Sequence, residues 1–384
     1  MLQDAPRRPI GRRPLAKALG KPVPLAVAEC VDLYEAQIAD LDESNRVDAI
    51  VVCRPDDLLD HPPTPARGAP VDPSSTQVDR RVVDFHDLLK ARLVGRRTPV
   101  QVLRSSTWDP SRSGGRAKGR ALQDEATRAW NIHTALYYKA GGVPWRLERQ
   151  PGTLGTLFVG VSFFHTPDRS EVHTSVAQVF DELGSGVVVR GGPAARHKDD
   201  RQPHLSRVDA EELLGSALDA YRREHHTQPA RVVVHKSSSF SDDEVTGIES
   251  ALDARAIEHV DLIWVVGDTE RCRLFRKSEN TVLRGTLLQL DPTRLVLFTR
   301  GSIEYYRTYP GMYVPVPLGL RPAVIESDPV MLSQEVLALS KMNWNQSQLD
   351  GRLPITLSAA RKIAGILKHV DDKRVVEGRF ANYM

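Results

Sequence analysis

The sequence contains little cysteine. Its three cysteines, Cys30, Cys53 and Cys272, are far apart among 384 residues, and no two of them form a CxxC pair. This spacing excludes a disulfide framework and a cysteine-based zinc site, because both need clustered thiols. Isolated cysteines are typical of a reducing compartment, and we therefore expect a cytoplasmic protein.

Long apolar runs are also missing. No stretch approaches the roughly 20 apolar residues that cross a membrane, so we expect no membrane partner. Residues 1–24 are rich in proline and arginine, and no apolar segment follows the basic start. They predict an irregular lead-in and no signal peptide. The net charge of +3 is too small to indicate a nucleic-acid partner, so the distribution of charge matters more than its sum.

A length of 384 residues with 41% hydrophobic residues is enough for two domains. In the first, residues 1–150, helices are expected at 27–41 and 82–93, and strands at 47–53 and 99–106. Alternating strands and helices predict a small parallel α/β domain, in which ligands gather at the carboxyl ends of the strands.

The pattern changes in the second domain, residues 151–384. Three consecutive strands are predicted first, at 155–164, 171–180 and 186–190. They are followed by a helix at 209–225, a strand at 231–236, a helix that begins at Ser241 and a strand at 259–266. A capping box opens the second of these helices. This order is that of an RNase H-like fold. Later strands are expected at 295–301 and 313–325, and helices at 329–340 and 356–370.

The segment WNIHTALYYKAGGVPWRL, residues 130–147, joins the two domains. It predicts a helix that ends at Gly141–Gly142, then a short strand at 145–147. Lys139 lies in the last helical turn, and on the residues alone it complements the helix dipole.

A lysine followed by x-G-G and x-P-W also resembles the boundary between the MID and PIWI domains of prokaryotic Argonautes. VPLGLRPAVIES, LSKMNWNQ and LPITLSAARKIAGIL are similar to the PIWI C-terminus of short Argonautes, in the same order. The resemblance extends from Val27 onward, and it implies a Rossmann-like MID domain followed by an RNase H-like PIWI domain. Short Argonautes carry a further strand-rich segment before the position of Val27, so the MID domain is expected to be shortened at its N-terminus.

The resemblance implies a pocket for the 5′-phosphate of a guide strand. The family pattern is an aromatic residue, a lysine one turn later, a glutamine, and the lysine before Gly-Gly, which here are His86, Lys90, Gln101 and Lys139. Cations and N–H donors suit a terminal phosphate, and a ring face accepts any base. His86 stands where tyrosine is common, and Ala135 where relatives have a polar or basic residue. Taken singly, each residue also fits a surface or strand-end position.

The family also uses the carboxylate at the end of the chain, often through a divalent cation. The C-terminal carboxylate of Met384 is therefore a candidate Mg²⁺ ligand beside the guide 5′ end. The alternative is a frayed terminus, as is common for chain ends.

RNase H-type cleavage needs carboxylates that bridge two Mg²⁺ ions. The resemblance places those ligands at Ser162, near Lys236 and near Arg361, and none of these residues is an acid. We therefore predict no nuclease activity and no catalytic residue. Lys236 and Arg361 become candidates for contacts with a nucleic-acid backbone instead.

A basic, glycine- and serine-rich segment lies between Arg104 and Arg120, after the strand predicted at 99–106. Its cations suit a phosphate backbone, although a solvated loop explains each of them singly. The candidate backbone contacts are Arg104, Arg112, Arg116, Lys118 and Arg120.

The resemblance implies the guide-binding subunit of a short Argonaute defence system. Such a subunit binds a 5′-phosphorylated guide RNA and recognises complementary single-stranded DNA without cleaving it. Its partner is an APAZ-containing effector protein with a TIR, sirtuin-like or nuclease domain. Two alternatives stay open: an active guided nuclease with a non-standard set of acids, and an α/β interaction protein that binds no nucleic acid.

Overall fold

The structure is a computed structural model. It describes residues 5–44, 46–59, 84–109, 111, 122–147, 155–165, 172–181, 186–189, 191–196, 200–267, 272–277, 281–306, 314–344, 351–370 and 377–384. The chain divides into two compact units. Unit 1 contains Met1–Gly142, His369–Arg374 and Ala381–Met384, and unit 2 contains Val143–Lys368 and Val375–Phe380. The predicted boundary at residue 150 lies outside the described residues.

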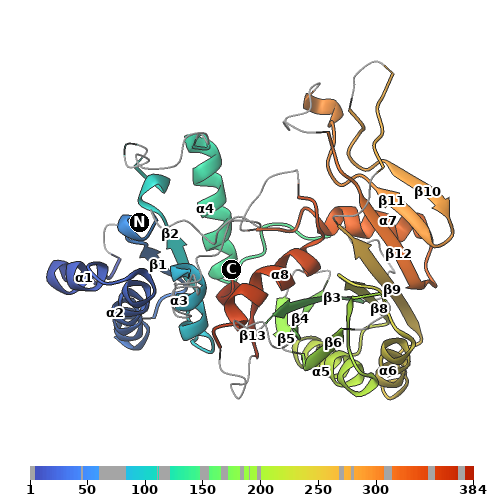
Figure 1. The fold of residues 1–384 in the computed structure, drawn as a ribbon, viewed down its shortest axis with the longest axis horizontal. Helices are drawn as coiled ribbons and strands as arrows, with labels where there is room; N and C mark the ends of the chain where they lie inside the picture. Colours follow the sequence, from blue (N-terminus) through green and yellow to red (C-terminus); the bar gives the residue numbers. More distant parts are fainter. Residues whose placement is uncertain are drawn as a thin grey trace, which may run out of the picture. The chain divides into compact units, whose positions relative to one another are not determined.

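Unit 1 is an α/β unit with a parallel pair of strands (Figure 1). Its elements are α1 (Arg12–Leu19), α2 (Val23–Ser44), β1 (Ile50–Cys53), η1 (Asp56–Leu59), α3 (Phe85–Leu93), β2 (Val100–Leu103), η3 (Ser105–Thr107) and α4 (Glu125–Lys139). β1 and β2 pair from Ile50 with Val100 to Cys53 with Leu103. The irregular lead-in predicted for residues 1–24 is wrong, because residues 12–19 form α1 and bury Ala18 against the core of this unit.

The core of unit 1 forms where the apolar stripe of α2 meets α3 and the strands. Val27, Val31 and Ile38 repeat at helical spacing on α2 and are buried, so this stripe faces the core. Phe85 and Leu89 supply the opposing face of α3. The predicted parallel α/β arrangement of this region is therefore confirmed.

Unit 2 is built on one long mixed sheet. Its strands are β3 (Thr156–His165), β4 (Val172–Asp181), β5 (Gly186–Val189), β6 (Pro193–Arg196), β7 (Pro203–His204), β8 (Arg231–Lys236), β9 (His259–Val266), β10 (Leu287–Asp291), β11 (Arg294–Leu297), β12 (Leu318–Val324) and β13 (Glu377–Arg379). Their order is β10-β11-β12-β9-β8-β3-β4-β5-β13, with β6 and β7 off this path. β3 to β5 pair antiparallel, whereas β8 runs parallel to both β3 and β9. This is the predicted RNase H-like order.

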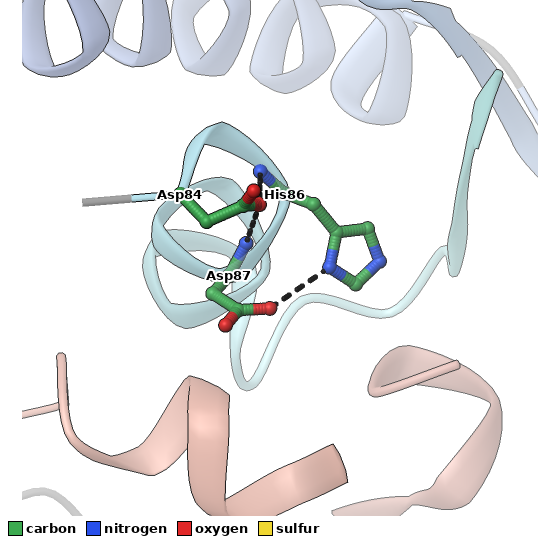
Figure 2. A group of neighbouring side chains, drawn as sticks. All are labelled: Asp84, His86 and Asp87. Atoms are coloured by element: carbon green, nitrogen blue, oxygen red, sulfur yellow. Dashed lines mark hydrogen bonds and ion pairs between the residues drawn. The ribbon is translucent and has the colours of Figure 1, made fainter. Parts of the chain in front are cut away.

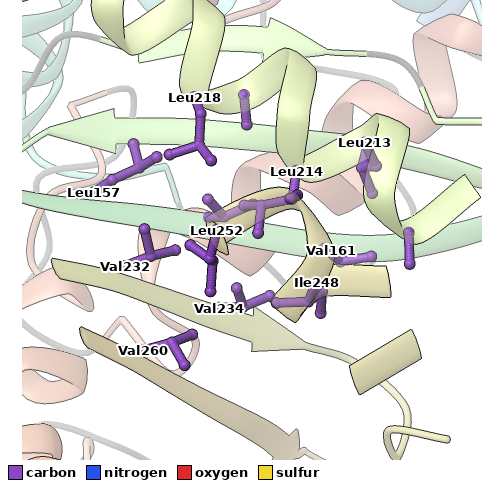
Figure 3. Close-up of a cluster of buried hydrophobic side chains, with 14 of the residues drawn as sticks. Leu157, Val161, Leu213, Leu214, Leu218, Val232, Val234, Ile248, Leu252 and Val260 are labelled. Carbon is purple, nitrogen blue, oxygen red and sulfur yellow. The ribbon is translucent and has the colours of Figure 1, made fainter. Parts of the chain in front are cut away.

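The two faces of this sheet are covered by different helices. On one face, α5 (Arg207–His225) and α6 (Asp242–Asp253) pack on alternate residues of β3 and β8, as Figure 3 shows. On the other face, α8 (Ile355–Leu367) approaches so closely that a Cβ at Gly160 would lie 2.3 Å from the carbonyl oxygen of Thr356. Glycine at this position therefore lets helix and strand touch. The remaining helix is α7 (Pro329–Leu339), which Asp328 caps.

Local signals located most elements but missed others. The short strand predicted at residues 145–147 is wrong: these residues form no ladder, and the indole Nε1 of Trp145 donates to the carbonyl of Lys341 at 2.9 Å. β6, β7, β10 and β13 were not predicted, because each is short and depends on its neighbours. Among the described residues, no helix is long and apolar enough to span a bilayer.

Candidate functional site

The first turn of α3 positions the histidine of the predicted pocket. Asp84 caps the helix, because its Oδ1 accepts the backbone N–H of His86 at 2.7 Å and of Asp87 at 3.4 Å. The His86 ring is half-exposed, and its Nδ1 lies 3.1 Å from the carboxylate of Asp87 (Figure 2). This contact orients the ring and leaves part of it accessible for stacking.

Two lysines of the predicted pocket are buried inside unit 1. Lys90 on α3 is 1% exposed, and Lys139 in the last turn of α4 is 3% exposed. The ammonium of Lys90 donates to the carbonyl of Val100 at the start of β2. Burial lowers the pKa of Lys90 well below its usual range, and the nearby charge of Lys139 lowers it further. The fold thus brings two cations close enough to repel each other.

The predicted glutamine lies on β2, directly after Val100, whose carbonyl accepts the hydrogen bond from Lys90. Gln101 pairs with Val51 in the register, and its Nε2 donates to the carbonyl of Val102 at 3.2 Å. Its Oε1 is buried and has no hydrogen-bond partner among the described residues. Gln101 therefore offers an acceptor in this conformation, which suits a hydroxyl or a base N–H better than a phosphate oxygen. Its phosphate-binding role remains a prediction.

Ala135 and Met384 complete the predicted set in unit 1. Ala135 is buried one turn before Lys139 and supplies no ligand. The end of the chain belongs to unit 1, where Tyr383 and Met384 are buried and the Asn382 amide donates to the carbonyl of Arg96 at 3.3 Å. The terminus is packed in this structure, which does not fit the frayed alternative.

Magnesium prefers oxygen ligands, and two places among the described residues of unit 1 are candidates for supplying them. One is the buried chain end at Met384, which carries a carboxylate in unit 1. The other is the group Asp84, His86 and Asp87, whose ligand atoms lie within 4.8 Å of one another. Asp84 is already engaged as the helix cap, and the role of the Met384 carboxylate as a Mg²⁺ ligand remains a prediction.

In unit 2, the carboxyl ends of β3 and β8 carry the positions where catalytic acids were sought. Val161 pairs with Lys236 in the parallel register, and the N–H of Ser237 continues the ladder to the carbonyl of Val161 at 3.0 Å. Val161 and Lys236 face α5 and α6, where both line the same small cavity. Because side chains alternate along a strand, Ser162 and Ser237 point toward the opposite face, where α8 lies.

This alternation corrects one sequence assignment. Lys236 is not a neighbour of Ser162 on the same face; Ser237, directly after the end of β8, holds the corresponding position. His235, which precedes Lys236, contacts the hydroxyl of Thr356 on α8 at 3.0 Å. This contact confirms that the side chains of His235 and Lys236 point to opposite faces of the sheet. No local sequence signal distinguished Lys236 from Ser237, because every side chain from Val232 to Lys236 is buried.

Lys236 is held inside unit 2 by a buried charge network. It is 1% exposed, and its ammonium lies 2.7 Å from the carboxylate of Glu244 and over the rings of Phe163 and Phe240 at 5.4 and 5.1 Å. Burial lowers the pKa of Lys236 to about 8, although Glu244 opposes the shift. His204 contacts the same carboxylate at 3.1 Å. This burial does not fit the predicted contact between Lys236 and a nucleic-acid backbone.

Arg361 keeps the exposure that a backbone contact requires. It projects from α8, and its Nη2 would lie 3.9 Å from a Cβ at Gly267, just beyond the carboxyl end of β9. The sheet edge near α8 thus carries two hydroxyls, from Ser162 and Ser237, and one guanidinium. None of these three side chains is a carboxylate.

The basic segment is only partly described. Arg104 is exposed at the start of η3. The guanidinium of Arg128 on α4 donates to the carbonyls of Ser106 and Thr107 at 3.1 and 2.7 Å, which ties η3 to α4. The other candidates, Arg112, Arg116, Lys118 and Arg120, lie outside the described residues.

Comparison with known proteins identifies the fold. No protein-family model matches the chain, and no curated protein matches it significantly. Clostridium butyricum Argonaute bound to a guide DNA and a 19-mer target DNA matches 75% of this chain with a TM-score of 0.56 at 18% identity. Aa-Ago with externally bound siRNA matches 92% with a TM-score of 0.58 at 16% identity. A. aeolicus Argonaute matches 78% with a TM-score of 0.53 at 17% identity.

These matches confirm the predicted fold class. The mixed α/β chain has the architecture of the MID and PIWI domains of Argonautes. It covers 37%, 44% and 39% of the three matched chains, which is less than half of each.

Proposed function

We propose that this chain is the guide-binding subunit of a short prokaryotic Argonaute system. It binds a 5′-phosphorylated guide RNA and uses it to recognise complementary single-stranded DNA. The observation that carries the proposal is the pair of buried lysines, Lys90 and Lys139, whose like charges repel each other in unit 1.

A phosphate explains why two cations are buried together. Taking an ammonium out of water costs several kcal/mol, and a second nearby cation adds repulsion. A terminal phosphate carries a charge of about −1.5 to −2 at neutral pH, which suits two lysines. His86, one turn before Lys90, supplies a ring for the first base, and the carboxylate of Met384 supplies a ligand for Mg²⁺. The ion would shield that carboxylate from the phosphate.

The same proposal assigns no cleavage to this chain. Two-metal catalysis needs carboxylates on both sides of the scissile phosphate, and Ser162, Ser237 and Arg361 provide none. Arg361 would instead bind the backbone of the guide or target. The chemistry then belongs to an APAZ-containing effector with a TIR, sirtuin-like or nuclease domain, activated when target DNA is recognised. This part of the proposal rests on the sequence resemblance, whereas the cytoplasmic location rests on the isolated cysteines.

The test compares short RNAs with a 5′-phosphate or a 5′-hydroxyl. Wild-type protein should prefer the phosphate, and Lys139→Met should reduce that preference by about 10- to 150-fold, because a hydrogen bond to a charged group is worth about 1.5–3 kcal/mol. Lys17→Met is the matched control, since it removes an exposed cation from α1 in the same unit. Equal, salt-sensitive binding of both RNAs by wild-type protein would refute the proposal.

The alternative of an active nuclease is tested on the same material. Guide-loaded protein is incubated with matched single-stranded DNA and Mg²⁺, and the products are separated by size. We expect intact DNA. Magnesium-dependent, guide-matched cuts would overturn the proposal that this chain does not cleave, and their loss in Ser237→Ala would locate the activity at the ends of β3 and β8.

A further inference from the structure

A stripe of aromatic side chains lies along the exposed face of α4. Trp130 is 54% exposed, Tyr137 is 50% exposed, and His133 between them is exposed too. Positions separated by three and four residues lie on one side of a helix. Ala135 and Lys139 are buried on the other side, so the stripe is not part of the lysine pocket.

Two of these rings are held parallel. The rings of His133 and Tyr137 are stacked, with centroids 6.4 Å apart and planes within 9° of each other. A Cβ at Gly142 would lie 2.4–2.6 Å from three atoms of the Tyr137 ring. The ring therefore lies against the backbone of Gly142, while half of the Tyr137 side chain remains exposed. A ring fixed in this way loses little freedom when a ligand stacks on it.

No acidic side chain of the segment from Ala126 to Gly142 repels an anionic ligand from the stripe, because this segment contains no aspartate or glutamate. Its formal charges are Arg128 and Lys139, and both cations are engaged elsewhere. Lys139 is buried on the other side of α4, and Arg128 donates to two backbone carbonyls of η3. The aliphatic side chains of this helix, Ile132 and Leu136, are half-buried, so the three rings dominate the exposed face.

The exposed area of the stripe suits a strand of nucleic acid better than a protein partner. An aromatic side chain buries about 150–250 Å², so three rings that are about half-exposed offer roughly 300 Å². A standard protein interface needs about 800 Å² on each partner. One or two bases need only the faces of the rings, which are sequence-tolerant stacking surfaces.

We propose that Trp130, His133 and Tyr137 form a stacking surface for unpaired nucleobases, separate from the pocket that holds the guide 5′-phosphate. This inference rests on the proposed function. Because the stripe lies away from Lys139, its bases come from beyond the first guide nucleotide or from an unpaired part of the target. Both sources share the same chemistry, a planar base on a phosphodiester chain.

The test measures affinity for 5′-phosphorylated RNAs of two lengths, a dinucleotide and an oligonucleotide longer than the pocket. Tyr137→Ala and Trp130→Ala should each weaken binding of the longer RNA by about 5- to 150-fold, because stacking on one aromatic ring is worth about 1–3 kcal/mol per base. Binding of the dinucleotide and the preference for a 5′-phosphate should not change. Tyr137→Trp should retain affinity, and Tyr305→Ala, an 86% exposed tyrosine in unit 2, is the matched control.

Guide RNA alone and guide paired with target DNA separate the two sources of the base. A loss seen with guide alone assigns the stripe to the guide, whereas a loss seen only with target present assigns it to the target. Unchanged affinity in both arms would overturn the inference. In that case, a lower mass of the Tyr137→Ala variant in sedimentation would identify the stripe as a contact between copies of the chain. If wild-type protein prefers the 5′-phosphate while the stripe variants change nothing, the proposed function stands and only this inference fails. Absence of any RNA binding by wild-type protein would overturn both.

Discussion

Replacing Lys90 with methionine should stabilise the guide-free protein and weaken guide binding. Methionine keeps the length of the side chain and removes the charge that α3 buries. Exchanging a buried ion pair for apolar residues of similar volume is neutral or stabilising by about 1–4 kcal/mol, because the exchange removes the desolvation cost that each buried ion carries. The variant also loses the hydrogen bond to the carbonyl of Val100, which is worth about 1 kcal/mol. The free energy of unfolding should therefore rise by up to about 3 kcal/mol, which is the surplus left after that loss.

The pH dependence of this gain has a definite sign. The pKa of Lys90 is lower in the folded chain than in the unfolded chain, because burial and Lys139 disfavour the ammonium. Between the lowered pKa and the usual lysine value, the unfolded chain binds more protons, so raising the pH stabilises wild-type protein in this window. Lys90→Met lacks this contribution, so its advantage should shrink as the pH rises toward the usual lysine range.

The assay is urea unfolding without guide at neutral and alkaline pH, analysed by linear extrapolation, with hydrogen exchange in α3 and β2 to locate the effect. Lys17→Met should change stability by less than about 0.5 kcal/mol, because Lys17 is exposed. The same preparations are tested for 5′-phosphate preference, which Lys90→Met should reduce. A loss of more than about 2 kcal/mol in Lys90→Met would refute the reasoning, because a lysine whose removal unfolds the protein belongs to the core and not to a ligand pocket.

Two further predictions concern unit 2. Glu244→Gln should lower the free energy of unfolding by about 3–5 kcal/mol, because it leaves the Lys236 ammonium buried without a counter-ion. Lys236→Met should lower the free energy of unfolding by less, because Glu244 still accepts hydrogen bonds from the backbone N–H groups of Leu205 and Ser241. Urea unfolding of both single variants and of the double variant measures the difference. Gly160→Ala should destabilise unit 2 by about 1–3 kcal/mol, because its methyl group would meet the backbone of α8. Thermal unfolding of Gly160→Ala measures this loss. Gly192→Ala is the matched control, because its methyl group would meet the side chain of Asp209, which can move, and not a backbone.

The outcomes that would contradict these two predictions are distinct. Equal costs for Glu244→Gln and Lys236→Met would mean that the pair, and not the unpaired lysine, sets the energy. A neutral Gly160→Ala would mean that α8 moves away from β3 at low cost, so the contact would not hold the helix in place.

Local sequence patterns predicted the elements that local chemistry determines. The capping box at Ser241 and Glu244 opens α6 as expected, because both of its hydrogen bonds lie within four residues. The buried strands β8 and β9 were located by their continuous apolar runs. These runs are short enough for a buried strand and too short for a typical helix. Where the pattern was short, as in β13, a partner distant in sequence decided the structure.

The candidate site depended more strongly on the fold. Sequence placed His86, Lys90, Gln101 and Lys139 in order along the chain, with His86 and Lys90 one helical turn apart. It did not show that Lys90 and Lys139 are buried close enough for one to lower the pKa of the other. Nor did it show which face of β8 carries Lys236, because the direction of a side chain follows from the register of the whole strand.

What the sequence determined by itself is therefore the order and type of the elements and the chemical identity of the residues at each site. Helix caps, apolar periodicity and strand composition act over a few residues, so they can be read along the chain. Tertiary structure alone decided that Glu244, a helix cap by sequence, also neutralises Lys236 on a neighbouring strand. It also decided that Lys90 meets Lys139 from another helix. Burial and charge pairing depend on residues that only folding brings together, and these are the quantities on which the proposed binding of a phosphate depends.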